Sequence, residues 1–126
     1  MVRILTVANG TTLLRPGIGA LHVAGYHVTM YNVASLRDLR YAAPDLLILA
    51  ADSATSVQML LAAIRADALL YDLPIIIIGG SWDVFATLPV ALLTDTILLL
   101  APFDEATLQD ATRMFVPTLM RARRSA

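Results

Sequence analysis

The chain has 126 residues, of which 58% are hydrophobic and 15% are charged, with a formal net charge of −1 and no cysteine. This composition predicts a single globular domain over residues 1–126, argues against nucleic acid as a partner, and excludes disulfide bonds and thiolate metal sites. The mean hydropathy of +0.72 is high, but apolar runs such as "TILLLAP" and the N-terminal "ILTVA" are too short for a spanning helix or a signal peptide, so we expect a cytoplasmic protein without a membrane partner.

Five short apolar runs recur along the chain, and none of them alternates apolar with polar residues. They are Arg3–Ala8, Val28–Tyr31, Leu46–Ala50, Ile75–Ile78 and Thr96–Leu100. Continuous apolar strands are typical of a parallel sheet that is buried on both faces. The segments between them, about 15–25 residues long, suffice for crossover helices. We therefore predict an α/β, flavodoxin-like, doubly wound sheet of five parallel strands in the order 2-1-3-4-5, with helices on both faces.

The connecting helices in the first half differ in how clearly the sequence predicts them. The first segment, "TTLLRPGIGALHVAG", is rich in helix breakers, so its helix should begin near Pro16. A short helix is expected at Ser35–Tyr41. A strong amphipathic helix is expected at Ser56–Ala68, which carries its apolar residues on one stripe.

The second half contains one weak helical segment and one strong one. The stretch "SWDVFATLPVALL" is interrupted by Pro89 and predicts one or two short turns. Asp104 is a good N-cap for the final helix, and Pro117 should end or kink it.

Four stretches, in this order, resemble the receiver (CheY-like) domain of two-component response regulators. They are "AGYHV" at Ala24–Val28, "PDLLIL" at Pro44–Leu49, "IRADALLYDLPIIII" at Ile64–Ile78 and "APFDEATL" at Ala101–Leu108. In that family two acids bind Mg²⁺, an aspartate at the end of strand three accepts a phosphoryl group, and a hydroxyl residue and a lysine contact the phosphoryl oxygens. The resemblance covers nearly the whole chain and implies a role in phosphorelay signalling.

The resemblance places a different residue at each of the five family positions. Ala8 and Asn9 stand for the acid pair, Ala50 for the acceptor, Gly79 for the hydroxyl residue and Ala101 for the lysine. Methyl groups neither ligate Mg²⁺ nor stabilise a transferring phosphoryl group. The resemblance therefore implies a degenerate pseudo-receiver that is not an enzyme and needs no metal or cofactor.

Asp52 is the acid nearest to the acceptor position, but it lies two residues beyond it. We expect the strand to end before Asp52, so that Asp52 or Ser53 belongs to a solvated loop and caps the next helix. His22 and His27 have no second metal ligand at helical spacing and no triad partner nearby, so we expect no chemistry from them.

Two glycine-bearing loops follow strands one and four and offer an alternative function. Backbone N–H groups in these loops could bind an anion at helix N-termini, which would make the protein a small-ligand sensor. The candidate residues are Asn9, Gly10, Thr11, Gly80 and Ser81. Ordinary strand-to-helix turns explain the same residues equally well.

The expected partner is another protein or an output domain, and a homodimer is expected as well. By the resemblance, the face formed by helix four, strand five and helix five carries partner contacts. The candidate interface residues are Trp82, Phe85, Leu98, Phe115 and Leu119, of which Leu98 occupies the family's switching aromatic position. Exposed aromatic residues here would suit an interface hot spot, but core contacts of a short helix are an equal alternative.

Overall fold

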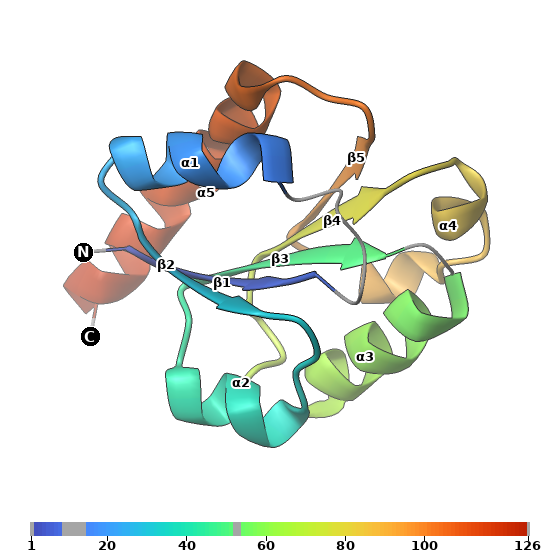
Figure 1. Ribbon diagram of the computed structural model, residues 1–126. Coiled ribbons are helices and arrows are strands. Elements are labelled where there is room, and N and C mark those ends of the chain that lie inside the picture. The colour runs from blue at the N-terminus through green and yellow to red at the C-terminus, as the bar shows by residue number, and fades with distance from the viewer. Residues whose placement is uncertain (1, 9–14, 52–53, 126) are drawn as a thin grey trace.

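The computed structural model describes residues 2–8, 15–51 and 54–125, and it shows the predicted sheet. All neighbouring strands pair in parallel, in the order β2-β1-β3-β4-β5 (Figure 1). The strands are β1 Arg3–Val7, β2 His27–Tyr31, β3 Leu46–Ala51, β4 Ile75–Gly79 and β5 Thr96–Leu100. The predicted fold class is therefore confirmed.

Helices cover both faces of the sheet. The elements are α1 Arg15–Val23, α2 Leu36–Ala42, α3 Ala54–Ala66, α4 Asp83–Ala86, a 3-10 turn at Val90–Leu92 and α5 Glu105–Ser125. Helices α1 and α5 pack on one face, and α2, α3 and α4 pack on the other (Figure 1). Among the described helices, none combines the length and apolar character that a membrane crossing requires.

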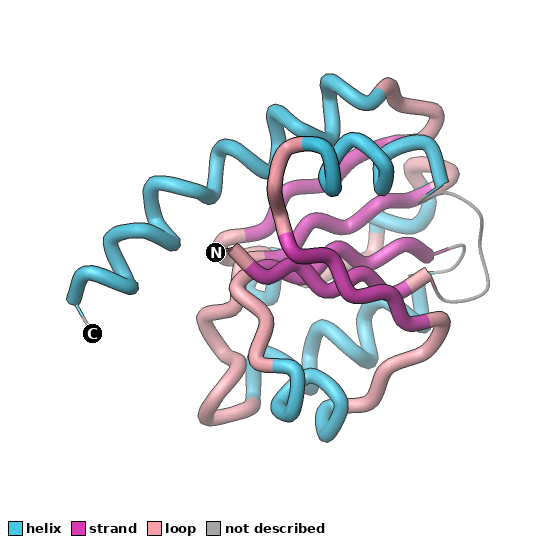
Figure 2. Tube along the Cα trace, turned by 60° about the vertical axis from the view of Figure 1, so that its left-hand side comes forward, coloured by secondary structure: helices cyan, strands magenta, loops and turns pink. Residues whose placement is uncertain are grey.

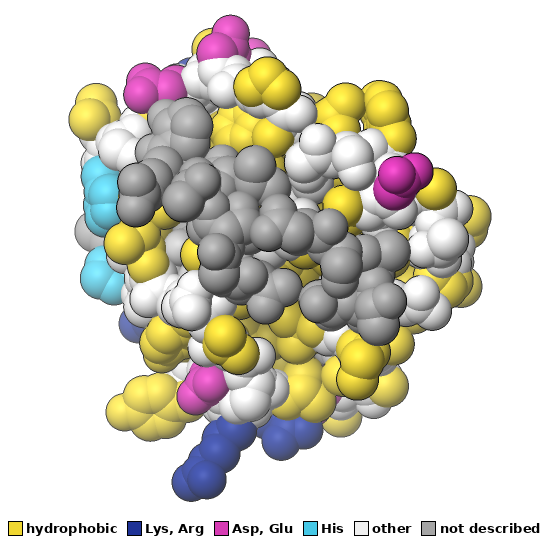
Figure 3. Space-filling view, turned by 45° about the vertical axis from the view of Figure 1, so that its right-hand side comes forward, with side chains coloured by type: hydrophobic (Ala, Val, Ile, Leu, Met, Phe, Trp, Pro, Cys, Tyr) yellow, Lys and Arg dark blue, Asp and Glu magenta, His cyan; other side chains and the backbone are white. Residues whose placement is uncertain are grey.

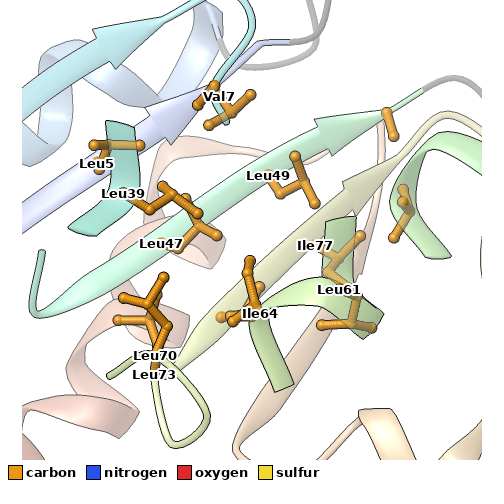
Figure 4. Packing of buried hydrophobic residues seen from close by; sticks show 14 of the residues in the cluster. Leu5, Val7, Leu39, Leu47, Leu49, Leu61, Ile64, Leu70, Leu73 and Ile77 are labelled. Atoms are coloured by element: carbon orange, nitrogen blue, oxygen red, sulfur yellow. The ribbon is translucent and has the colours of Figure 1, made fainter. Parts of the chain in front are cut away.

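The two faces of the central strands bury two separate hydrophobic clusters. Successive side chains of a strand point to opposite faces, so both faces of a doubly covered strand must be apolar. Leu47, Leu49 and Ile77 point toward Leu61 and Ile64 of α3 (Figure 4). On the other face the alternate residues of β1, β3 and β4 pack against α1 and α5, in a cluster with Ile4, Leu21, Ile48, Ile76 and Leu108.

Side-chain caps begin two of the helices. At α2, the Ser35 hydroxyl accepts a hydrogen bond from the Asp38 N–H, and the Asp38 carboxylate accepts one from the Ser35 N–H. At α5, Asp104 Oδ1 accepts a hydrogen bond from the Thr107 N–H at 2.8 Å. The hydrogen bonds from Thr107 hold the pKa of the Asp104 carboxyl below its usual value. The prediction that Asp104 caps the final helix is confirmed.

Most predicted boundaries agree with the structure, but Pro117 does not end α5. The helix continues to Ser125, because proline removes only one backbone hydrogen bond and good helix formers follow it. As predicted, the first helix begins next to Pro16, and Pro89 separates two short helical turns. Figure 2 shows that the C-terminal half of α5 projects beyond the body of the domain.

Arg65, near the end of α3, joins α3 to the loops that lead into β4 and β5. Its guanidinium donates to the carbonyl oxygens of Tyr71 (3.0 Å), Leu73 (2.7 Å), Leu92 (3.2 Å) and Thr94 (2.6 Å), and to Thr96 Oγ1 (3.0 Å). Partial burial lowers the pKa of Arg65, while the charges of Asp95 and Asp72 act in the opposite direction. One side chain thus satisfies five acceptors at the amino edge of the sheet.

An ion pair ties α2 to the residue that follows α3. Arg40 Nε donates to Asp67 Oδ2 at 2.8 Å, and Nη2 contacts the same oxygen. The other carboxylate oxygen of Asp67 accepts the Leu69 N–H at 2.9 Å. The hydrogen bond from Arg40 is the main reason that the pKa of Asp67 is lowered.

Candidate functional site

The carboxyl ends of the strands meet at one edge of the sheet, where the family-like positions were expected. Ala8 follows β1 and donates its N–H to the Tyr31 carbonyl, and the Ala101 N–H, after β5, bonds to the Gly79 carbonyl, each at 2.8 Å. Ala50 lies in β3, where its register partner is Ile78 of β4. Ala50 is a buried member of the hydrophobic cluster on the α1 and α5 side, and Ala8 and Ala101 are partly buried and pack against this cluster. The structure therefore brings three of the five positions together, as packed methyl groups.

Gly79 ends β4 beside two side chains of α4. A Cβ atom at this position would lie 2.9 Å from Phe85 Cζ and 3.1 Å from Val84 Cβ. Phe85 also packs edge-on against Trp82, with ring centroids 5.9 Å apart. The Phe85 ring thus fills the space that a hydroxyl-bearing side chain at position 79 would need.

Parts of the predicted site lie outside the described residues. These parts are Asn9, Gly10, Thr11 and the acid Asp52. Gly80 and Ser81 are described and exposed, just beyond β4. Figure 3 views this side of the molecule obliquely: hydrophobic side chains cover much of the described surface, and acidic side chains lie near its margins.

The described part of this edge does not fit the magnesium ion that receiver domains bind. Mg²⁺ needs hard oxygen ligands, above all carboxylates, whereas Ala8, Ala50 and Ala101 present methyl groups. Across the described ranges, the structure contains no group of three histidine, cysteine, aspartate or glutamate residues that could hold a metal ion. We therefore propose no metal-dependent chemistry at this edge.

The five candidate interface residues occupy different environments. Trp82 is 67% exposed, and Leu98 is half-buried on the edge strand β5. Phe85 and Phe115 are buried in the two hydrophobic clusters. Each ring fills space between a helix and the sheet, so neither is exposed, and for Phe85 this is the core contact of a short helix that was the alternative prediction. The side chain of Leu119 lies outside the described residues.

Comparisons with known proteins support the fold but find no close relative. No protein-family model matches the chain, and no curated protein matches it. Among solved structures, a response regulator from Desulfuromonas acetoxidans superimposes with a TM-score of 0.75 at 17% identity, covering 94% of this chain and 99% of its own. A chemotaxis response regulator of Vibrio cholerae gives a TM-score of 0.70 at 20% identity, with coverages of 92% and 99%.

A third neighbour is the receiver domain of a sensor histidine kinase from Pseudomonas aeruginosa, which holds a magnesium ion in its active-site cleft. It gives a TM-score of 0.67 at 22% identity and covers 92% of this chain and 98% of its own. These structural neighbours are receiver domains of the CheY-like type. The chain has their fold.

Sequence reasoning missed the contact that fills the hydroxyl position. Gly79 was identified as a substituted residue, but Phe85 was not identified as the group beside it. A glycine at the end of a buried strand often marks a close approach of another group, and the aromatic residue in the following short helix was the available signal.

Proposed function

We propose that this chain is a non-catalytic pseudo-receiver, a receiver-like domain of phosphorelay signalling that acts in the cytoplasm through phosphorylation-independent contacts with another protein. The observation that carries the proposal is the packing of Ala8, Ala50 and Ala101 in one hydrophobic cluster. By the resemblance, these three positions are ones at which receiver domains carry charged residues.

The physical basis of this proposal is the negative charge that the transferring phosphoryl group carries in the transition state. The transferring group spreads negative charge over several oxygens, and catalysis consists largely of positioning this group and stabilising its charge. Methyl groups at the strand ends supply neither ligands nor donors, and the Phe85 ring lies where a hydroxyl group would stand beside Gly79. Signalling by a shift in protein–protein binding requires none of these groups.

The proposal predicts that the protein is not phosphorylated by small phosphodonors. The chain is incubated with acetyl phosphate and Mg²⁺ and examined by intact mass spectrometry, with the Vibrio cholerae chemotaxis response regulator as a positive control. Addition of beryllofluoride should leave the fluorescence of Trp82, the single tryptophan, unchanged.

A mass increase of one phosphoryl group would contradict the proposal. The variant Asp52→Asn then identifies the acceptor: loss of the added mass in this variant would make Asp52 a displaced phosphoacceptor. Retention of the added mass would point to an acceptor elsewhere in the chain.

The proposed partner surface includes α4 and β5, and the proposal extends to a homodimer through this face. Trp82 is 67% exposed, and Val90, in the turn after α4, is 85% exposed. Leu98 and its neighbours in β5 are only half-buried. Tryptophan is enriched in interface hot spots.

One feature of the described residues supports the alternative, in which the protein binds an anion. Gly80 and Ser81 are exposed at the carboxyl edge of the sheet, where ligands of flavodoxin-like folds bind. A rise in melting temperature with inorganic phosphate or nucleotides would favour this alternative over the protein-binding role.

A further inference from the structure

A groove of about 260 Å³ opens near the amino ends of β1 and β2, away from the degenerate edge. Its lining includes Arg3, His27, Thr29, Tyr31 and Tyr41. Apolar groups, among them Leu5 and Pro44, complete the lining. The groove therefore combines an apolar surface with several polar side chains, as small-molecule sites commonly do.

The groove results from incomplete coverage of the sheet. Helix α2 has only seven residues, a length of about 10 Å. It packs its buried Leu39 on the sheet, and its last residues, Tyr41 and Ala42, form a wall of the groove. β2 is the edge strand, so no further strand extends the sheet beyond it.

Strand register places the polar groups of β1 and β2 on the same face. Arg3 pairs with His27, and Leu5 pairs with Thr29, in the parallel ladder. Paired residues on neighbouring parallel strands point to the same side, so Arg3 and His27 lie next to each other at one end of the groove. Thr29 and Tyr31 follow along β2 toward the other end.

Arg3 is available to a ligand. Arg40 pairs with Asp67 and Arg113 pairs with Asp110, and neither of these ion pairs among the described residues involves Arg3 or His27. The nearby Asp45 carboxylate accepts the backbone N–H of Arg3 at 2.8 Å and is not among the lining residues. The Arg3 side chain is exposed, and a guanidinium pairs with a carboxylate through two parallel hydrogen bonds.

Tyr41 supplies an aromatic surface beside Arg3 and His27. Its side chain is 91% exposed, so the ring is accessible to a ligand. The volume of the groove lies slightly below the usual range for drug-sized ligands. Size, charge and the exposed ring together favour a compact ligand with one ring and one acidic group.

We propose that this groove binds a single-ring aromatic carboxylate, with the carboxylate against Arg3 and His27 and the ring against Tyr41. The hydroxyl groups of Thr29 and Tyr31 are placed to donate to polar substituents on the ring. The site is independent of the proposed signalling role, because no residue of the degenerate edge belongs to it.

The test is a titration of the full chain with benzoate and 4-hydroxybenzoate, followed by ¹H–¹⁵N NMR, with benzamide as the uncharged control. Saturable shifts are expected at the amides of residues 3–5, 27–31 and 41–42, and only weak shifts with benzamide. Arg3→Gln should weaken binding about tenfold, and Tyr41→Ala about three- to tenfold. Arg37→Gln, at an exposed arginine of α2 outside the lining, should change affinity less than twofold.

Three outcomes would overturn the proposal: no saturable shift, shifts centred on Gly80 and Ser81, or equal effects of Arg3→Gln and Arg37→Gln. The NMR spectrum of each unliganded variant reports whether it folds. Should Arg3→Gln fail to fold, Tyr41→Ala carries the test, because its exposed side chain contributes little to the core.

Discussion

Gly79 stands at the end of β4, where a Cβ atom would meet Phe85 and Val84 within 3.1 Å. Both of these side chains are buried, so they have little room to move. The glycine and the phenylalanine are therefore complementary: the missing side chain at one position makes room for the ring at the other. Phe85 belongs to the cluster on the α2, α3 and α4 side of the sheet, and Ala50 and Ala101 lie with the cluster on the other side, so this part of the edge is apolar on both faces.

Gly79→Thr should lower the free energy of unfolding by about 1–3 kcal/mol, because the new side chain overpacks a filled space. Unfolding in urea measures the change. Gly19→Ala is the matched control, since Gly19 lies in α1 and an added Cβ would have no described atom within 4 Å apart from its chain neighbours and the backbone of its own helix. The control should raise stability by about 0.5–1 kcal/mol. A Gly79→Thr variant as stable as the unmodified chain would show that Phe85 moves aside freely.

At the scale of elements, Arg65 is the main polar link between α3 and the loops before β4 and β5. Its five acceptors belong to two chain segments, residues 71–73 and 92–96. Among the described hydrogen bonds, no other charged side chain links these segments to α3. β5 is an edge strand with only β4 beside it, so its attachment depends strongly on this link.

Arg65→Met should lower the free energy of unfolding by about 2–4 kcal/mol, because it leaves several carbonyl groups without their charged donor. Amide hydrogen exchange should also become faster in β5 than in β1 or β3. Arg113→Ala, which removes an exposed ion pair with Asp110, should change stability by less than about 0.5 kcal/mol. Similar losses in the two variants would contradict a special role for Arg65.

The strands and helices could be predicted where a sequence pattern continues over several neighbouring residues. The uninterrupted apolar runs identified the five strands, and the carboxyl ends of parallel strands meet at one edge, which placed Ala8, Ala50 and Ala101 together in advance. The sequence leaves Phe85 open between a core contact and an exposed interface residue, because α4 has only four residues and shows no usable periodicity. Of the two outcomes predicted at Pro117, an end or a kink of the helix, the end is wrong, since local propensity does not measure what the rest of a long helix tolerates.

At the scale of the whole molecule, exposed apolar side chains lie in two separate regions around a sheet that is otherwise covered. Trp82 and Val90 lie in the chain segment between β4 and β5, whereas the groove lies beside β2, the opposite edge strand from β5. The two candidate surfaces share no residue. Partner binding and ligand binding can be tested independently.

The proposed homodimer predicts a solution mass of twice the chain mass, measured by light scattering after size-exclusion chromatography. Trp82→Ala should weaken the dimer by a factor of about thirty, because a hot-spot residue contributes about 2 kcal/mol or more. Met59→Ala is the control: Met59 is also exposed, but it lies on α3, and its removal should leave the mass unchanged. A monomer at all concentrations would contradict the dimer.

The packed methyl groups of Ala8, Ala50 and Ala101 also affect how well the fold tolerates single substitutions at these positions. An aspartate introduced at Ala50 alone would place a carboxylate in a fully buried, apolar position, where an unpaired charge is strongly unfavourable. Metal ligands introduced before an acceptor aspartate would give no functional gain, because there would be no phosphoryl group for the metal ion to stabilise. A path of single substitutions toward a phosphate-accepting edge that starts at Ala50 therefore begins with a loss of stability.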